Sequence, residues 1–286
     1  MNKSITVIGG DLRQLTLAEL LSKDGFSVKV YGFGDDYISD KYHVIKELIT
    51  AEPSDIIILP MPVSTDGKTI NAPLNCEPIS FSYIKHYIKS AKLILGGRLS
   101  NEVVSLTSGI KTIDYYKREE LMIKNAVPTA EGAIEIAMNE TPHTIKNCKC
   151  LIIGYGRIGK VLSRMLYDLG ADVTVSARKY SDLAWIETNG YHAVHNNNIE
   201  KSAARYDIIF NTAPALILHE DILKQINPDS VIIDLASKPG GVDFEKAADL
   251  GLKVIWALSL PGKVAPLTSG KIIKDTILNI LEEEGV

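Results

Sequence analysis

Three glycines, Gly154, Gly156 and Gly159, have the spacing that most directly predicts chemistry in this chain of 286 residues. In a turn from a strand to a helix, the first glycine of such a pattern permits a tight bend and the second lets a pyrophosphate approach the backbone. The third lets the helix pack close to the strand, so that the helix N-terminus faces the phosphates. The spacing predicts a dinucleotide site, although ordinary turns also contain glycines spaced in this way.

The sequence on either side of these glycines favours the dinucleotide interpretation. Residues 150–153 are apolar or nearly so, as expected of a buried parallel strand, and apolar residues recur at helical spacing between residues 158 and 169. A second strand is expected over residues 172–176. This order of strand, glycine turn, helix and strand is typical of a Rossmann domain.

The end of the second strand predicts which dinucleotide binds. NAD sites usually have an acidic residue there, bonded to the ribose 2′-hydroxyl, whereas this chain has Ser176-Ala177-Arg178-Lys179. A carboxylate would repel a 2′-phosphate, but a small hydroxyl followed by two cations supplies a hydrogen bond and charge-assisted contacts. We therefore predict NADP(H). The alternative is a solvated Arg-Lys pair after a strand.

Two later strand-end loops, residues 211–214 and 235–241, are expected on the rim where a nicotinamide would lie. The predicted cofactor-binding residues are Gly154, Tyr155, Gly156, Arg157, Ile158, Gly159, Ser176, Ala177, Arg178, Lys179, Thr212, Ala213, Pro214, Leu235, Ala236 and Ser237.

The first half of the chain opens with a smaller version of the same motif. A strand over residues 5–8 is followed by Gly9-Gly10 and a helical pattern that contains Asp11, Arg13 and Gln14. Asp11 suits a helix N-cap, which would be a structural role. Arg13 and Gln14 flank a turn at the carboxyl end of a strand, where open α/β sheets bind ligands. Anion binding and a solvated helix start remain open here.

Two further loops are expected on the same rim as the Gly9-Gly10 turn. One contains Pro60-Met61-Pro62 and the other contains Gly96-Gly97-Arg98. Either loop is suited to close around a ligand or to serve as a plain connector. Residues 60–78 are long for a connection between a strand and a helix, which makes them a candidate lid.

Strands and helices alternate along the whole chain, which predicts an α/β fold with two doubly wound parallel-sheet domains. Further strands are expected over residues 27–31, 55–59, 92–95, 111–113, 191–194, 207–210, 231–234 and 253–256, and helices over 42–50, 81–89, 102–107 and 268–283. The expected domains are a substrate domain over 1–126 joined by the C-terminal helix 267–286, a crossing helix and linker over 127–146, and a Rossmann domain over 147–266.

A helical pattern over residues 117–138 is interrupted at Val127-Pro128. The residue before a proline is disfavoured in a helix, and proline suits the first turn of a new one. Thr129 and Glu131 would then lie in that first turn, either as capping residues or pointing into a cleft between the domains.

Composition excludes several classes of partner. With 45% apolar residues the chain can bury a substantial core, and a net charge of −4 without a basic stripe argues against nucleic acid and anionic membranes. The first residues lack the apolar core of a signal peptide, so we expect a cytoplasmic protein. Neither the three cysteines, Cys76, Cys148 and Cys150, nor the six histidines have metal-site spacing; we expect buried thiols and no metal.

The layout resembles that of 2-hydroxyacid and alanine dehydrogenases. The former normally have an arginine after the fourth strand of the cofactor domain and a histidine in a Pro-His loop near its end. This chain has Ser237-Lys238 and Pro261-Gly262 at those places. Because no histidine acid/base is present there, oxidation of an alcohol would lack its proton acceptor.

A closer resemblance extends over essentially the whole chain. It is carried by VIGGDLRQ (residues 7–14), VPTAEG (127–132), GYGRIG (154–159), SAR (176–178), DLASKPGGVDF (234–244) and LPGKVAP (260–266). These segments resemble the A-subunit family of bacterial dipicolinate synthases. The resemblance implies NADP-linked formation of dipicolinate from dihydrodipicolinate in sporulation, in the mother-cell cytoplasm, together with a smaller flavoprotein-like B subunit. A homo-oligomer is also expected.

Dehydrogenation of a dihydropyridine is driven by aromatisation, so positioning of the substrate matters more than a strong base. Two substrate carboxylates need cations and backbone N–H groups. The predicted substrate-binding residues are Gly9, Gly10, Arg13, Gln14, Arg98, Thr129 and Ser237, and the predicted catalytic residues are Asp11, Arg13, Glu131, Ser237 and Lys238. Asp11 and Glu131 are the candidate proton acceptors. The alternative function is a non-catalytic NADP(H)-binding or regulatory subunit that positions a flavoprotein partner.

Overall fold

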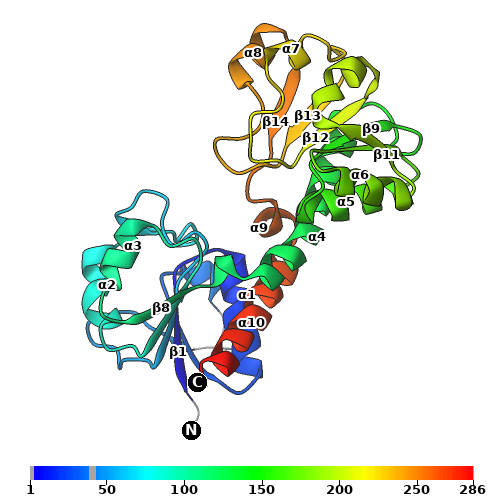
Figure 1. The fold of residues 1–286 in the computed structure, drawn as a ribbon. Helices are drawn as coiled ribbons and strands as arrows, with labels where there is room; N and C mark the ends of the chain where they lie inside the picture. Colours follow the sequence, from blue (N-terminus) through cyan, green and yellow to red (C-terminus); the bar gives the residue numbers. More distant parts are fainter. Residues whose placement is uncertain (1–2, 39–42, 286) are drawn as a thin grey trace. The chain divides into compact units, whose positions relative to one another are not determined.

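The computed structural model describes residues 3–38 and 43–285, which form two compact units (Figure 1). The N-terminal unit consists of Met1–Lys124 and Ala265–Val286, and the C-terminal unit of Asn125–Val264. Each unit has its own parallel sheet and its own apolar core. The predicted fold class, two parallel-sheet α/β domains, is confirmed.

The N-terminal unit contains a six-stranded parallel sheet in the order β3-β2-β1-β4-β7-β8. Its strands are β1 (Ser4–Ile8), β2 (Ser27–Tyr31), β3 (His43–Val44), β4 (Ile56–Ile58), β7 (Leu93–Gly96) and β8 (Lys111–Asp114). The helices between them are α1 (Leu12–Lys23), α2 (Phe81–Ile88) and α3 (Asn101–Leu106). Helices cover both faces, so the central strands are apolar throughout: all three residues of β4 are buried.

The helix α10 (Pro266–Glu283) packs along α1 and completes the N-terminal core. Gly270 makes this close approach possible, because a Cβ there would lie 2.6 Å from the carbonyl oxygen of Arg13. Ile273 and Ile277 of α10 are fully buried in the same cluster as Leu17 of α1.

The C-terminal unit repeats this strand order with β11-β10-β9-β12-β13-β14, again all parallel. Its strands are β9 (Lys149–Ile153), β10 (Asp172–Ala177), β11 (His192–His195), β12 (Ile208–Asn211), β13 (Val231–Asp234) and β14 (Lys253–Trp256). Its helices include α5 (Arg157–Asp168), α6 (Tyr180–Thr188), α7 (Glu220–Leu223), α8 (Phe244–Asp249) and α9 (Leu260–Val264). Both sheets are therefore doubly wound in the same way.

The helix α4 (Glu119–Glu140) runs through Pro128 without interruption, so the expectation of a new helix starting there is wrong. Pro128 has no N–H to donate to the carbonyl of Lys124, and the boundary between the units falls directly after that residue. Within the described residues, no helix is both long and apolar enough to cross a bilayer.

The helix expected over residues 42–50 is also absent from the described part of that range, which begins at His43. His43–Val44 instead pairs with β2 as an edge strand, and the Ile45 amide extends the ladder with a 2.9 Å bond to the Val30 carbonyl. Ile45 and Leu48 are buried in the core from this strand and turn. Their spacing matched a helix, but sheet pairing decided the structure.

The long loop after β4 contains a small hairpin of β5 (Thr69–Ile70) and β6 (Ile79–Ser80). Ile70 is buried against the Gly9 turn: a Cβ on Gly9 would lie 2.7 Å from its Cγ2 atom. The candidate lid thus packs on the N-terminal glycine turn.

Cys148 and Cys150 are buried as expected, and hydrogen bonding with Cys148 together with burial raises the pKa of the Cys150 thiol. Cys76 is exposed, which corrects the expectation for that residue, because it lies in the polar connection before β6.

Candidate active site

Two glycines of the turn after β9 are required by the protein's own packing. Gly154 has φ +99°, a conformation that favours glycine. A Cβ on Gly159 would collide with the carbonyl oxygen of Gly154. These two residues therefore shape the turn and hold α5 against the sheet.

Gly156 differs from its neighbours because nothing in the protein requires it to be a glycine. Its φ of −83° suits any residue, and a Cβ there would meet no atom within 4 Å. Gly156 is also the N-cap of α5, and no side chain caps that helix. Open space before the uncapped first turn of a 12-residue helix fits a bound phosphate group. Of the other residues in the motif, Arg157 is exposed and Tyr155 and Ile158 are half-buried.

The loop after β12 is joined directly to the glycine turn. The Thr212 hydroxyl donates to the carbonyl of Ile153 at 2.9 Å, and it lies 2.7 Å from where a Cβ on Gly154 would stand. Ala213 is half-buried beside it, and Pro214 is exposed. The structure therefore brings this predicted loop and the glycine turn together.

A buried polar pair, Asn211 and Asp234, lies at the ends of β12 and β13 and was missed from the sequence. Both residues are fully buried and are neighbours in the sheet register. The Asn211 side-chain amide donates to Asp234 at 2.8 Å, and the backbone amides of Ala236 and Gly241 donate to the same carboxylate at 2.9 and 2.8 Å. The available signal was a polar residue that ends each of two otherwise apolar strands.

The loop that begins at Leu235 has a buried beginning and an exposed middle. Leu235 and Ala236 are buried, whereas Ser237 and Lys238 are exposed. The indole N–H of Trp256 donates to the Ala236 carbonyl at 3.0 Å, and the Lys238 ammonium lies 6.0 Å from the Trp256 ring centroid. Trp256 therefore supports this loop from β14.

At the end of β10, the structure corrects the role expected for Ser176. Its side chain is fully buried, and among the described residues its hydroxyl has no hydrogen-bond partner. It is enclosed because the sheet is covered on both faces, so it does not reach a 2′-phosphate. Ala177 is buried as well, and the exposed residues at this strand end are Arg178 and Lys179.

The N-terminal turn is filled by its own side chains. Asp11 caps α1 by accepting from the Arg13 amide at 2.9 Å, and its carboxylate also pairs with the Arg13 guanidinium at 2.8 Å. The guanidinium donates further to the Met61 carbonyl at 2.9 Å. Gln14 is fully buried, and its side chain lies 2.6 Å from where a Cβ on Gly10 would stand. Asp11, Gly9, Gly10, Arg13 and Gln14 thus form one closed cluster.

Arg98 and Tyr115 lie on the neighbouring loops of the same sheet. Arg98 is exposed with φ +58°, and its guanidinium carbon is 5.2 Å from the centroid of the Tyr116 ring. Tyr115 is buried and donates to the Leu59 carbonyl at 2.9 Å; burial raises the pKa of its hydroxyl. Arg98 is therefore an exposed cation on this rim.

The two candidate residues on α4 have different surroundings. The Thr129 hydroxyl donates to the Asn125 carbonyl at 2.7 Å in the middle of the helix, so the expected place at a helix start is wrong. Glu131 is exposed, and within the described part of the chain its carboxylate has no hydrogen-bond or ion-pair partner.

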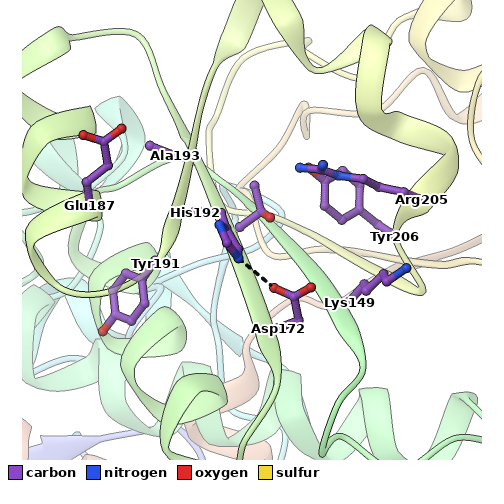
Figure 2. A pocket seen from close by; sticks show the side chains of 9 residues that line it. Lys149, Asp172, Glu187, Tyr191, His192, Ala193, Arg205 and Tyr206 are labelled. Carbon is purple, nitrogen blue, oxygen red and sulfur yellow. Dashed lines mark hydrogen bonds and ion pairs between the residues drawn. The ribbon is translucent and has the colours of Figure 1, made fainter.

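A pocket of about 440 Å³ in the C-terminal unit is lined by none of the candidate residues of that unit (Figure 2). The pocket is lined by the first residues of three strands, Lys149, Asp172 and His192. It therefore lies at the amino ends of the strands, whereas the glycine turn lies at their carboxyl ends. The His192 Nε2 atom lies 3.2 Å from the Asp172 carboxylate there, with the histidine largely exposed and the aspartate about half exposed. The pocket does not belong to the dinucleotide site.

Comparison with known families assigns both halves of the chain. Residues 4–116 match the family model of the N-terminal domain of the dipicolinate synthase A subunit. Residues 122–283 match the model of the C-terminal domain of alanine dehydrogenase/PNT. This second domain belongs to an oxidoreductase family and indicates a nicotinamide dinucleotide cofactor.

Whole-chain relatives agree with the domain matches. The A subunit of dipicolinate synthase from Bacillus subtilis (strain 168) is 31% identical over 284 residues, covering 98% of this chain and 96% of that protein. A crystal structure of the dipicolinate synthase A subunit from Bacillus halodurans superposes with a TM-score of 0.90 at 29% identity, covering 98% of both chains. The crystal structure of the Bacillus subtilis protein gives 0.88 at 30% identity, covering 99% of this chain and 97% of that one.

Proposed function

The chain belongs to the A-subunit family of dipicolinate synthases, and from this we propose that it catalyses the NADP-linked oxidation of dihydrodipicolinate to dipicolinate during sporulation, together with a B subunit. The observation that carries the dinucleotide part is the open space at Gly156, before the uncapped start of α5. The family supports the substrate, and the absence of a histidine at Pro261-Gly262, which the structure places in α9, argues against an alcohol.

In this proposal, residues 154–159 hold the pyrophosphate through backbone N–H groups of the turn and of the first turn of α5. The exposed side chains of Arg178 and Lys179 meet the 2′-phosphate. No carboxylate stands at the end of β10 to favour the 2′-hydroxyl of NAD. This is the support for NADP(H) over NAD(H).

The reaction removes two hydrogens from the dihydropyridine ring. NADP⁺, when bound, would supply the acceptor for one of them as a hydride, and the other would leave as a proton as the ring becomes aromatic. Glu131 is the proton acceptor that we propose, because its carboxylate is exposed on α4. Asp11 is the weaker candidate, since its carboxylate already caps α1 and pairs with Arg13.

The two substrate carboxylates need cations or N–H donors. Arg98 in the N-terminal unit and Ser237 and Lys238 in the C-terminal unit are exposed, and we propose them for this role. Arg13 remains a candidate, although its guanidinium already donates to Asp11 and to the Met61 carbonyl.

The test mixes the purified protein with dihydrodipicolinate and NADP⁺, with and without the B subunit, and follows the absorbance of the reduced nicotinamide. We expect formation of NADPH and dipicolinate in equal amounts. Turnover only with the B subunit would support a shared site. No absorbance rise in either mixture, with NADPH binding retained, would instead indicate a non-catalytic cofactor-binding or regulatory subunit.

A further inference from the structure

Asp234 is a fully buried carboxylate that the proposed reaction does not use directly. It lies at the last position of β13, and it accepts hydrogen bonds from the Asn211 side chain and from the amides of Ala236 and Gly241. A buried charge is costly unless donors satisfy it. Three donors meet this carboxylate, and none of the described residues forms an ion pair with it. An asparagine of the same shape would offer only one acceptor oxygen to those donors.

Two of the three donors belong to the loop after β13, and the third, Asn211, is the last residue of β12 and is bonded to the loop that follows it. Asn211 is bonded at 3.0 Å from its amide to the Ala213 carbonyl, and at 3.2 Å from the Ala213 amide to its side-chain oxygen. Ala236 and Gly241 belong to the loop after β13. Asp234 is therefore the point at which the 212–214 loop and the 235–241 loop are tied to one another.

The two loops pack tightly around Asp234. A Cβ on Gly241 would collide with the Asn211 amide and lie 2.8 Å from the Ala213 carbonyl oxygen. A Cβ on Gly240, whose φ is +89°, would lie 2.8 Å from the Asp234 carboxylate. The loops thus contact each other backbone to backbone, around one charged group.

We propose that Asp234 is a positioning residue, which fixes the separation of these two loops so that the nicotinamide ring is held in one reactive orientation. The proposal rests on the proposed function in that it takes these loops as the nicotinamide side of the site. It assigns Asp234 to orientation of the ring and leaves affinity to the glycine turn and Arg178, which lie on other strand ends.

The experiment compares Asp234→Asn with the parent protein in two measurements. The first is the affinity for NADPH and the emission spectrum and lifetime of its bound nicotinamide, which need no substrate. The second is turnover of dihydrodipicolinate. We expect the Kd for NADPH to change less than about threefold, the nicotinamide emission to shift toward that of free NADPH, and kcat to fall by about 100-fold.

Asp207→Asn is the matched control. Asp207 directly precedes β12, at the amino ends of the strands, whereas Asp234 lies at a carboxyl end. Its carboxylate accepts a hydrogen bond from the Lys149 amide at 2.7 Å. The Asp207→Asn substitution should lower the stability of the protein without altering the nicotinamide emission or kcat. Equal effects of the two substitutions, or an unchanged nicotinamide signal in Asp234→Asn, would show that Asp234 has only a structural role and would overturn the proposal.

A second variant keeps the test decisive if Asp234→Asn does not fold. Trp256→Phe removes the bond to the Ala236 carbonyl and keeps an aromatic ring beside Phe244, at a half-buried position on β14. We expect the same shift in nicotinamide emission with about a tenfold fall in kcat; no shift would count against positioning by this loop. If the parent protein does not turn over the substrate, the proposed function fails, while the nicotinamide signals still decide the role of Asp234.

Discussion

The two sheets have the same strand order, yet the helices that follow their central glycine turns differ in how their N-termini are capped. In the C-terminal unit, α5 starts at Gly156 with no capping side chain and with open space around the glycine. In the N-terminal unit, α1 starts with Asp11 as its cap, and Gln14 closes a capping box. One turn leaves its N–H groups for a ligand, and the other satisfies them internally.

This difference shows that a strand–glycine–helix motif is not by itself a binding site. Asp11 and Arg13 neutralise each other at the N-terminal turn, and the Gln14 side chain fills the space next to Gly10. The sequence predicted a dinucleotide site at residues 154–159 and left anion binding open at the turn of residues 9–14. The geometry supports anion binding at residues 154–159. At residues 9–14, side chains of the N-terminal unit itself occupy the turn.

The largest expected effect separates the two turns by adding one methyl group to each. Gly156→Ala should leave thermal stability unchanged but weaken NADPH binding by about 10- to 100-fold, because the methyl group takes the space of the pyrophosphate. Gly10→Ala should do the reverse, since its φ of +109° and the Gln14 side chain oppose a Cβ. Calorimetry and NADPH titration check both; equal losses of affinity would contradict the comparison.

The second effect concerns Arg13, whose buried guanidinium pairs with the half-buried carboxylate of Asp11. Arg13→Met should lower the free energy of unfolding by about 2 to 3 kcal/mol, because Asp11 and the Met61 carbonyl lose their donor. Urea unfolding followed by circular dichroism measures this. Lys23→Met is the control, because the Lys23 side chain, paired with Glu19 on the same helix, is largely exposed, so its loss should matter by less than about 0.5 kcal/mol. If Arg13→Met instead raised the KM and left the free energy of unfolding unchanged, Arg13 would be assigned to substrate binding.

The third effect sharpens the assignment of the cofactor. Arg178→Ala should weaken NADPH binding by about tenfold and leave NADH binding unchanged, because only NADPH has the 2′-phosphate. Ser176→Ala is the matched variant two residues earlier, and its buried hydroxyl should make no difference to either cofactor. Equal affinity of the parent protein for NADPH and NADH would refute the 2′-phosphate argument.

The smallest effect concerns Asp55 and Asp207, which occupy matching places before the fourth strand of each sheet. Asp55 accepts from the Ser4 amide as Asp207 does from Lys149. The hydrogen bond from Lys92, and then those from Ser4, lower the pKa of Asp55 from 3.8 to about 2. Folding thus favours the ionised carboxylate, and its stabilisation is complete above pH of about 4 and lost as the pH falls toward 2.

Asp55→Asn should therefore cost about 1 kcal/mol or less at pH 7, since the Lys92 side chain is largely exposed. The difference from the parent protein should shrink below about pH 4, as measured by urea unfolding at several pH values. A difference that is constant down to pH 3 would mean that the carboxylate charge is not what Ser4 and Lys92 stabilise.

The parallel sheets were predictable because their strands are continuous apolar runs between glycine-rich turns. Residues 150–153 and 231–233 show this directly. Pro128 misled because a local helix-breaking signal was outweighed within the 22-residue helix α4. Residues 43–50 misled because backbone pairing with β2 decided their structure, and pairing is not visible in a local pattern.

The site was predictable where a motif is local and hidden where partners are distant in sequence. The glycine turn is contained in six residues. Asp234 and Asn211 are 23 residues apart, so their pairing follows only from the strand order. Ser176 looked available because the sequence shows the end of a strand but not the layers that cover it.

The position of α10 has a consequence for the order in which the two units can fold. The C-terminal unit is continuous in the chain, whereas the N-terminal unit needs Ala265–Val286, which follow it. During synthesis, all residues of the C-terminal unit therefore precede the last residues of the N-terminal core, because the apolar side of α1 with Leu17 and Leu21 packs against Ile273 and Ile277. The half of the molecule that is synthesised first is the half that finishes folding last.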